Sequence, residues 1–146
     1  MSDFRTLSDS MLASPQITPS DLQDAKEQGV TLVVNNRPEG ESPDQTPGAE
    51  IEAAARAAGL QYRAIPIDHS GFSLSQVAAM DEALTAAEGK VLAYCRSGTR
   101  STFLWALAQA RRGTAPAALV ATASAAGYDI SPIAGMLQQL AQARST

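Results

Sequence analysis

The fold of this chain is decided by residues 91–101, which read VLAYCRSGTRS. Residues 91–94 are apolar and predict a strand, a short loop begins at Cys95, and a helical pattern covers residues 101–112. In this order of elements, loop N–H groups and the N-terminus of the helix can bind an anion without a metal ion. Cys95 would lie at the base of the loop, where these groups and Arg100 stabilise its thiolate. We therefore expect a cysteine-dependent enzyme.

Strand and helix patterns alternate along the rest of the sequence. Strands are expected at residues 4–7, 11–13, 30–34, 62–67 and 91–94. Helices are expected at residues 18–29, 49–58, 73–89, 101–112, 115–126 and 132–143. This alternation predicts an α/β fold with a mostly parallel central sheet flanked by helices, formed by one domain over residues 1–146.

The connections after three of these strands carry the polar residues. They cover residues 35–40, 68–72 and 95–100. Because parallel sheets bind ligands beyond the carboxyl ends of their strands, we expect these loops to meet at one edge. Pro66 cannot donate to a strand ladder, so it marks a sheet edge or the end of its strand.

Composition excludes several classes of function. The formal charge of −4 and the isoelectric point near 4.9 argue against a nucleic-acid partner. No apolar run approaches the roughly 18 residues that cross a bilayer, and the N-terminus lacks a signal-peptide core. One cysteine and one histidine make an ordinary zinc site implausible. We expect a cytoplasmic protein without a membrane partner, a metal ion or another cofactor.

Two motifs together resemble a known bacterial family. Residues 33–41 read VVNNRPEGE, and with residues 91–101 they resemble the phosphatase-like domain of beta-lactamase-hydrolase-like proteins. The strand–loop–helix unit also resembles protein tyrosine and dual-specificity phosphatases, whose signature is H-C-x-x-G-x-x-R-[ST]. The resemblance implies a cysteine-phosphatase-like fold. Because the family domain occurs alone or fused to a metallo-hydrolase of the persulfide-dioxygenase kind, it also implies a possible partner of that kind.

The chain departs from the phosphatase signature at two positions. Arg100 follows Cys95 by five residues rather than six, and Tyr94 replaces the histidine. The sequence CRSGTRS instead resembles the active-site loop of single-domain rhodaneses, which are sulfurtransferases, although the remaining chain does not. A shorter loop makes a tighter ring of N–H groups, better matched to one extra sulfur than to a phosphoryl group with three equatorial oxygens.

Three functions are therefore considered, each of which involves a small anion such as thiosulfate, a persulfide or a phosphate ester. We favour a transferase that moves sulfane sulfur from thiosulfate or a persulfide donor through a persulfide of Cys95. The alternative is a tyrosine or dual-specificity-like phosphatase that hydrolyses phosphate monoesters through a phosphocysteine. The third is a non-catalytic anion-binding module.

Four residues of the loop have expected roles beside the cysteine. Arg100 should point its planar guanidinium at the transferred anion. Gly98 should allow the backbone to turn its N–H inward. Ser97 and Thr99 should act mainly through their backbone N–H groups.

Five further residues keep two interpretations each. Arg96 could attract anions at the pocket mouth or be solvated, and Ser101 could cap the helix, donate to the thiolate, or do both. Arg37 could reach the pocket as a second anion clamp or pair with a nearby glutamate. Asp68 is a candidate general acid or a turn residue, and His69 could assist proton transfer or be solvated.

Overall fold

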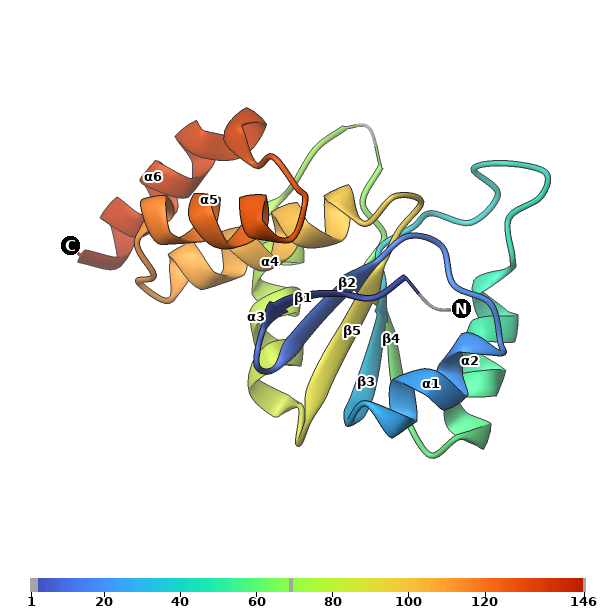
Figure 1. Cartoon of the computed structure of the whole chain (residues 1–146). Coiled ribbons are helices and arrows are strands. Elements are labelled where there is room, and N and C mark those ends of the chain that lie inside the picture. The colour runs from blue at the N-terminus through green and yellow to red at the C-terminus, as the bar shows by residue number, and fades with distance from the viewer. Residues whose placement is uncertain (1–2, 69, 146) are drawn as a thin grey trace.

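A five-stranded sheet forms the centre of the molecule, with helices on both faces (Figure 1). The computed structural model describes residues 3–68 and 70–145. The strands are β1 (Arg5–Ser8), β2 (Met11–Ser14), β3 (Val30–Asn35), β4 (Gln61–Ala64) and β5 (Lys90–Tyr94). Their order in the sheet is β1-β2-β5-β3-β4, and only the edge strand β1 pairs antiparallel with its neighbour. The predicted mostly parallel α/β architecture is confirmed.

The helices divide into two layers. They are α1 (Asp21–Glu27), α2 (Gly48–Ala57), α3 (Leu74–Ala86), α4 (Thr99–Arg111), α5 (Pro116–Ala125) and α6 (Ala134–Ser145), with a 3₁₀ turn η1 at Ser131–Ile133. Helices α1 and α2 cover one face of the sheet, and α3 to α6 lie on the other side (Figure 1). No helix among residues 3–68 and 70–145 is long and apolar enough to cross a bilayer.

Strand β5 lies in the middle of the sheet and is buried on both faces. Leu92 packs in the core against α1 and α2, whereas Ala93 packs in the core that includes α4. A strand covered on both faces reads as a continuous apolar run, which is the pattern that identified it in the sequence. This packing fixes the carboxyl end of β5, from which the loop at Cys95 begins.

Most element boundaries differ from the sequence prediction by one to three residues, and two of these differences bear on the site. Strand β4 ends at Ala64 rather than at residue 67, because Pro66 has no N–H to continue the ladder. The N–H groups of Ile65 and Ile67 nevertheless donate to the carbonyl oxygens of Asn35, the last residue of β3, and of Asn36, so this segment continues beside that strand. Helix α4 begins at Thr99, two residues earlier than expected, which shortens the loop after Cys95.

Candidate active site

The loop after β5 bends back so that a backbone N–H reaches the cysteine. Cys95 is fully buried, and the N–H of Gly98 donates to its Sγ over 3.1 Å. Gly98 caps the N-terminus of α4 with a φ of 93°, a left-handed conformation in which a side chain would be strained. A thiolate at Cys95 would thus meet one N–H donor and the positive end of the dipole of α4.

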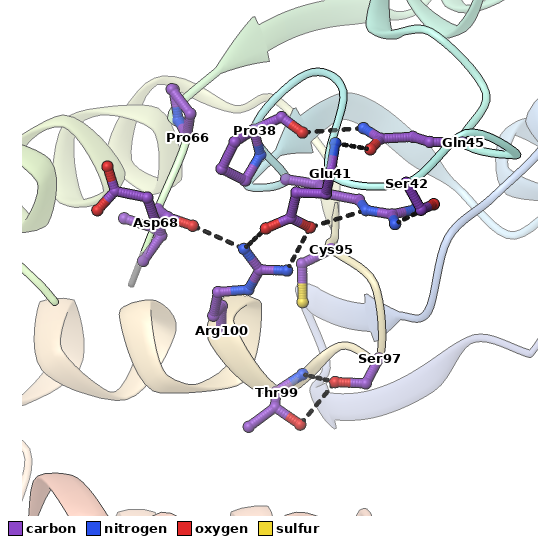
Figure 2. A network of polar contacts seen from close by, with 12 residues as sticks. Pro38, Glu41, Ser42, Gln45, Pro66, Asp68, Cys95, Ser97, Thr99 and Arg100 are labelled. Carbon is purple, nitrogen blue, oxygen red and sulfur yellow. Dashed lines mark hydrogen bonds and ion pairs between the residues drawn. The ribbon is translucent and has the colours of Figure 1, made fainter. Parts of the chain in front are cut away.

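Arg100 joins three loops at the carboxyl edge of the sheet. Its Nη1 and Nη2 donate to the two carboxylate oxygens of Glu41 over 2.7 and 2.9 Å, and Nη1 also donates to the Ile67 carbonyl over 2.7 Å. Figure 2 shows the guanidinium beside the Cys95 sulfur. The hydrogen bond to Glu41, together with the nearby Cys95, raises the pKa of Arg100, so its charge persists at every physiological pH. The predicted meeting of the three loops is confirmed.

Arg37 is buried behind Glu41 rather than open to a ligand. Its Nε donates to Glu41 over 2.9 Å, its Nη1 to Gln16 over 3.0 Å, and its Nη2 to Ser42 over 3.1 Å. Every guanidinium nitrogen of Arg37 is therefore engaged. Of the two interpretations of Arg37, the geometry corresponds to pairing with a glutamate, because the side chain is buried, only 4% exposed, and is held by Glu41, Gln16 and Ser42.

The sequence indicates Glu41 only as one of two possible partners of Arg37 and does not predict its pairing with Arg100. The hydrogen bond from Arg100, followed by that from Arg37, outweighs burial and lowers the pKa of Glu41 from 4.5 to about 2. The carboxylate is therefore ionised and acts as a bridge between two arginines. Its spacing of four residues after Arg37 is the only signal of this role that the sequence carries.

Ser101 does not take either of the positions expected for it. It lies inside the first turn of α4, because Gly98 is the N-cap, and its hydroxyl donates to Asn36 Oδ1 over 2.8 Å. Asn36 Nδ2 in turn donates to the Ile65 carbonyl over 2.9 Å. This buried chain of hydrogen bonds connects the start of α4 to the segments that follow β3 and β4. It therefore fixes the position of α4, and of the loop that precedes it, relative to the sheet.

Ser97 and Thr99 bond to one another within the loop, so the Thr99 N–H, which was expected to face an anion, is engaged by the Ser97 hydroxyl instead. The Ser97 hydroxyl donates to Thr99 Oγ1 over 2.9 Å and accepts the Thr99 N–H over 3.3 Å (Figure 2).

Tyr94, which stands where the phosphatase signature has histidine, packs in the core with α1 and α2, where burial raises the pKa of its hydroxyl. The Tyr94 side chain therefore lies on the face of the sheet opposite to the one that α4 covers.

A hollow of about 400 Å³ opens beside the guanidinium of Arg100. Its lining residues come from all three loops and are Pro38, Glu39, Gly40, Glu41, Asp68, Arg96 and Arg100. Arg96 is exposed at its mouth. Asp68 Oδ1 accepts from the N–H of Ser70 over 2.8 Å, and Figure 2 shows its carboxylate directed away from Cys95. His69 lies outside the described residues.

The sequence and structure of the chain are similar to those of known proteins. A sequence model of the phosphatase-like domain of beta-lactamase hydrolase-like protein matches residues 3–112. A beta-lactamase hydrolase-like protein of Xylella fastidiosa is 42% identical over 82 residues, which is 56% of this chain and 19% of that protein. One from Agrobacterium fabrum is 34% identical over 94 residues, covering 64% and 22% of the two chains. The chain thus spans about a fifth of these relatives' length.

Solved structures show the same fold. A phosphatase candidate from Neisseria meningitidis has a TM-score of 0.83 at 28% identity and covers 93% of this chain and 96% of its own. TpbA of P. aeruginosa has a TM-score of 0.71 at 18% identity, with 99% and 92% covered. The likeness to TpbA shows the fold alone, whereas the family match and the likeness to the Neisseria protein identify a phosphatase-like domain. The chain belongs to the family of phosphatase-like domains of beta-lactamase hydrolase-like proteins.

Proposed function

We propose that the protein is a cysteine-based phosphatase that hydrolyses phosphate monoesters through a phosphocysteine at Cys95. The observation that carries this proposal is the position of Cys95, whose sulfur accepts the Gly98 N–H beside the Arg100 guanidinium in a cysteine-phosphatase fold. The likeness to the Neisseria phosphatase candidate supports the phosphoryl group as the one transferred.

The chemistry follows from the charges at the loop. The Cys95 thiolate attacks phosphorus, the bond to the ester oxygen breaks, and the leaving alkoxide or phenoxide takes a proton. Arg100 binds the equatorial oxygens through donors that Glu41 does not occupy. Water then attacks the phosphocysteine and releases inorganic phosphate. Asp68 lines the hollow of about 400 Å³ that Arg100 also lines. It is the candidate proton donor once its carboxylate turns toward the leaving oxygen.

Sulfur transfer is the second candidate, favoured by two observations. Arg100 follows Cys95 by only five residues, and the Asp68 carboxylate points away from the sulfur. In this reaction the thiolate attacks the outer sulfur of thiosulfate, an Sγ–S bond forms, and the S–S bond breaks with its electron pair on sulfite. Sulfite is a stable anion, so this step needs no proton donor. The persulfide then passes its outer sulfur to a thiolate or cyanide.

One pair of measurements separates the candidates. Wild type and Cys95→Ser are assayed for turnover of an aryl phosphate and, after incubation with thiosulfate, for intact mass. Turnover that Cys95→Ser abolishes supports the phosphatase, whereas a gain of one sulfur in wild type alone supports sulfur transfer. Anion binding that survives Cys95→Ser, with neither reaction, would identify a non-catalytic module and refute both candidates.

The cellular partner and location follow as proposals of their own. A metallo-hydrolase of the persulfide-dioxygenase kind is proposed as a partner, because the curated relatives are about five times longer than the segment they share with this chain. Co-purification of such a hydrolase with tagged protein from the cytoplasm of the source cell would support both points, and its absence from that fraction would count against them.

A further inference from the structure

We propose that Tyr128 is a positioning residue that holds the N–H of Gly98 on the cysteine sulfur. The Tyr128 hydroxyl donates to the carbonyl oxygen of Ser97 over 3.2 Å. That carbonyl and the Gly98 N–H belong to one planar peptide group and point in opposite directions. A donor on the carbonyl side therefore fixes the direction in which the N–H reaches Cys95, over 3.1 Å.

The space around Gly98 shows how closely Tyr128 approaches the loop. A Cβ atom added at Gly98 would collide with the Tyr128 hydroxyl. Tyr128 follows α5 and is buried, and its own N–H donates to the Ala123 carbonyl over 2.9 Å. The Arg5 guanidinium of the edge strand β1 lies 5.2 Å from the ring centre, a cation–π contact. The Tyr128 side chain is therefore held at its hydroxyl and over one face of its ring.

The charge state of Tyr128 suits a donor. Burial raises the pKa of its hydroxyl, although the positive charge of Arg5 opposes this shift. The hydroxyl therefore keeps its proton at neutral pH. Hydrogen bonds in series polarise one another, so a donor on the Ser97 carbonyl strengthens the Gly98 N–H as a donor to sulfur. The charged groups that face this pair are Arg100 beside Cys95, and Arg5 with Asp3 beside Tyr128.

Tyr128 lies outside the segment that the family sequence model covers, which ends at residue 112. The C-terminal helices therefore contribute to the reactive loop as well as to the core. The inference rests on the proposed function only in assuming that Cys95 reacts as a thiolate. It holds equally for phosphoryl and for sulfur transfer, because the Gly98 N–H stabilises the same sulfur charge in both.

The test measures the alkylation of Cys95 by iodoacetamide as a function of pH, with no substrate present. Tyr128→Phe keeps the ring and removes the hydroxyl, so we expect the alkylation profile to move to higher pH and the rate at neutral pH to fall about twofold, since the Gly98 N–H remains and loses only part of its strength. Tyr62→Phe is the matched control, since it removes another partly buried hydroxyl, one that accepts from Asn35. We expect its profile to match that of wild type.

Two further measurements keep the test decisive. The amide resonance of Gly98 should move in Tyr128→Phe and stay in place in Tyr62→Phe. If Tyr128→Phe does not fold, Arg5→Met removes the cation over the ring and should shift the alkylation profile in the same direction by a smaller amount. An unchanged profile in the folded variants would overturn the inference. Because alkylation needs no substrate, a failure of the proposed reaction leaves this result readable.

Discussion

Replacing Glu41 by glutamine should remove a defined part of the acid sensitivity of this protein. Glu41 is the carboxylate that bridges Arg37 and Arg100, and only 16% of its side chain is exposed. Its pKa falls from 4.5 to about 2 in the folded protein, with the hydrogen bond from Arg100 as the largest cause. Such a difference corresponds to about 3 kcal/mol of folding free energy, an order-of-magnitude figure.

The sign of the pH dependence follows from the direction of this shift. A carboxylate with a lowered pKa stabilises the folded state fully above its unfolded value of 4.5, and the contribution is lost as pH falls toward 2. Wild type should therefore lose roughly 2 kcal/mol through Glu41 between about pH 7 and about pH 3. Glutamine cannot ionise, so Glu41→Gln should be less stable at neutral pH and approach wild type in acid.

Urea denaturation at a series of pH values measures this difference. Urea is preferred over guanidinium chloride because it leaves ion pairs unscreened. Glu52→Gln is the matched control, since Glu52 pairs with Arg56 four residues later on the exposed surface of α2. That pair should contribute about 0.5 kcal/mol or less. The reasoning is refuted if the stability difference between wild type and Glu41→Gln does not shrink in acid, or matches that of the control.

Two other substitutions test the loop directly. Arg100→Lys cannot make the paired contact with Glu41 and an anion at once, so we expect kcat/KM to fall about a hundredfold in steady-state assays of whichever reaction is found. Gly98→Ala places a side chain at a φ of 93° and against the Tyr128 hydroxyl, so urea denaturation should show a loss of roughly 1–3 kcal/mol.

The sheet and its loop could be predicted from the sequence because their signals are local. The apolar run of β5 and the glycine at residue 98 each indicate the local backbone conformation from only a few neighbouring residues. Pro66 likewise fixed the end of β4 more tightly than the apolar pattern around it suggested. The same local reading placed the loops at residues 35–40, 68–72 and 95–100 at one edge, where the hollow is found.

The partners of the site residues could not be predicted because they are distant in sequence. Glu41 lies 59 residues from Arg100, and Tyr128 lies 31 residues from Ser97. Ser101 was expected to cap its own helix or to donate to the Cys95 thiolate, yet its hydroxyl donates to Asn36, which is 65 residues away. Such contacts depend on how the loops and the C-terminal segment pack together, and no periodicity or spacing in the chain encodes that packing.

The number of donors at the loop bears on which group is transferred. An arginine carries five N–H donors, and Arg100 uses three of them on Glu41 and the Ile67 carbonyl. Two remain for a ligand, beside the first-turn N–H groups of α4 other than that of Thr99, which donates to the Ser97 hydroxyl. A phosphoryl group presents three equatorial oxygens and draws on all of these donors. A persulfide presents one sulfur and needs fewer. Phosphoryl transfer at this site would therefore depend strongly on the loop backbone as well as on Arg100. The fall in kcat/KM, measured for Gly98→Ala and for Arg100→Lys in the same assay, would compare the two contributions.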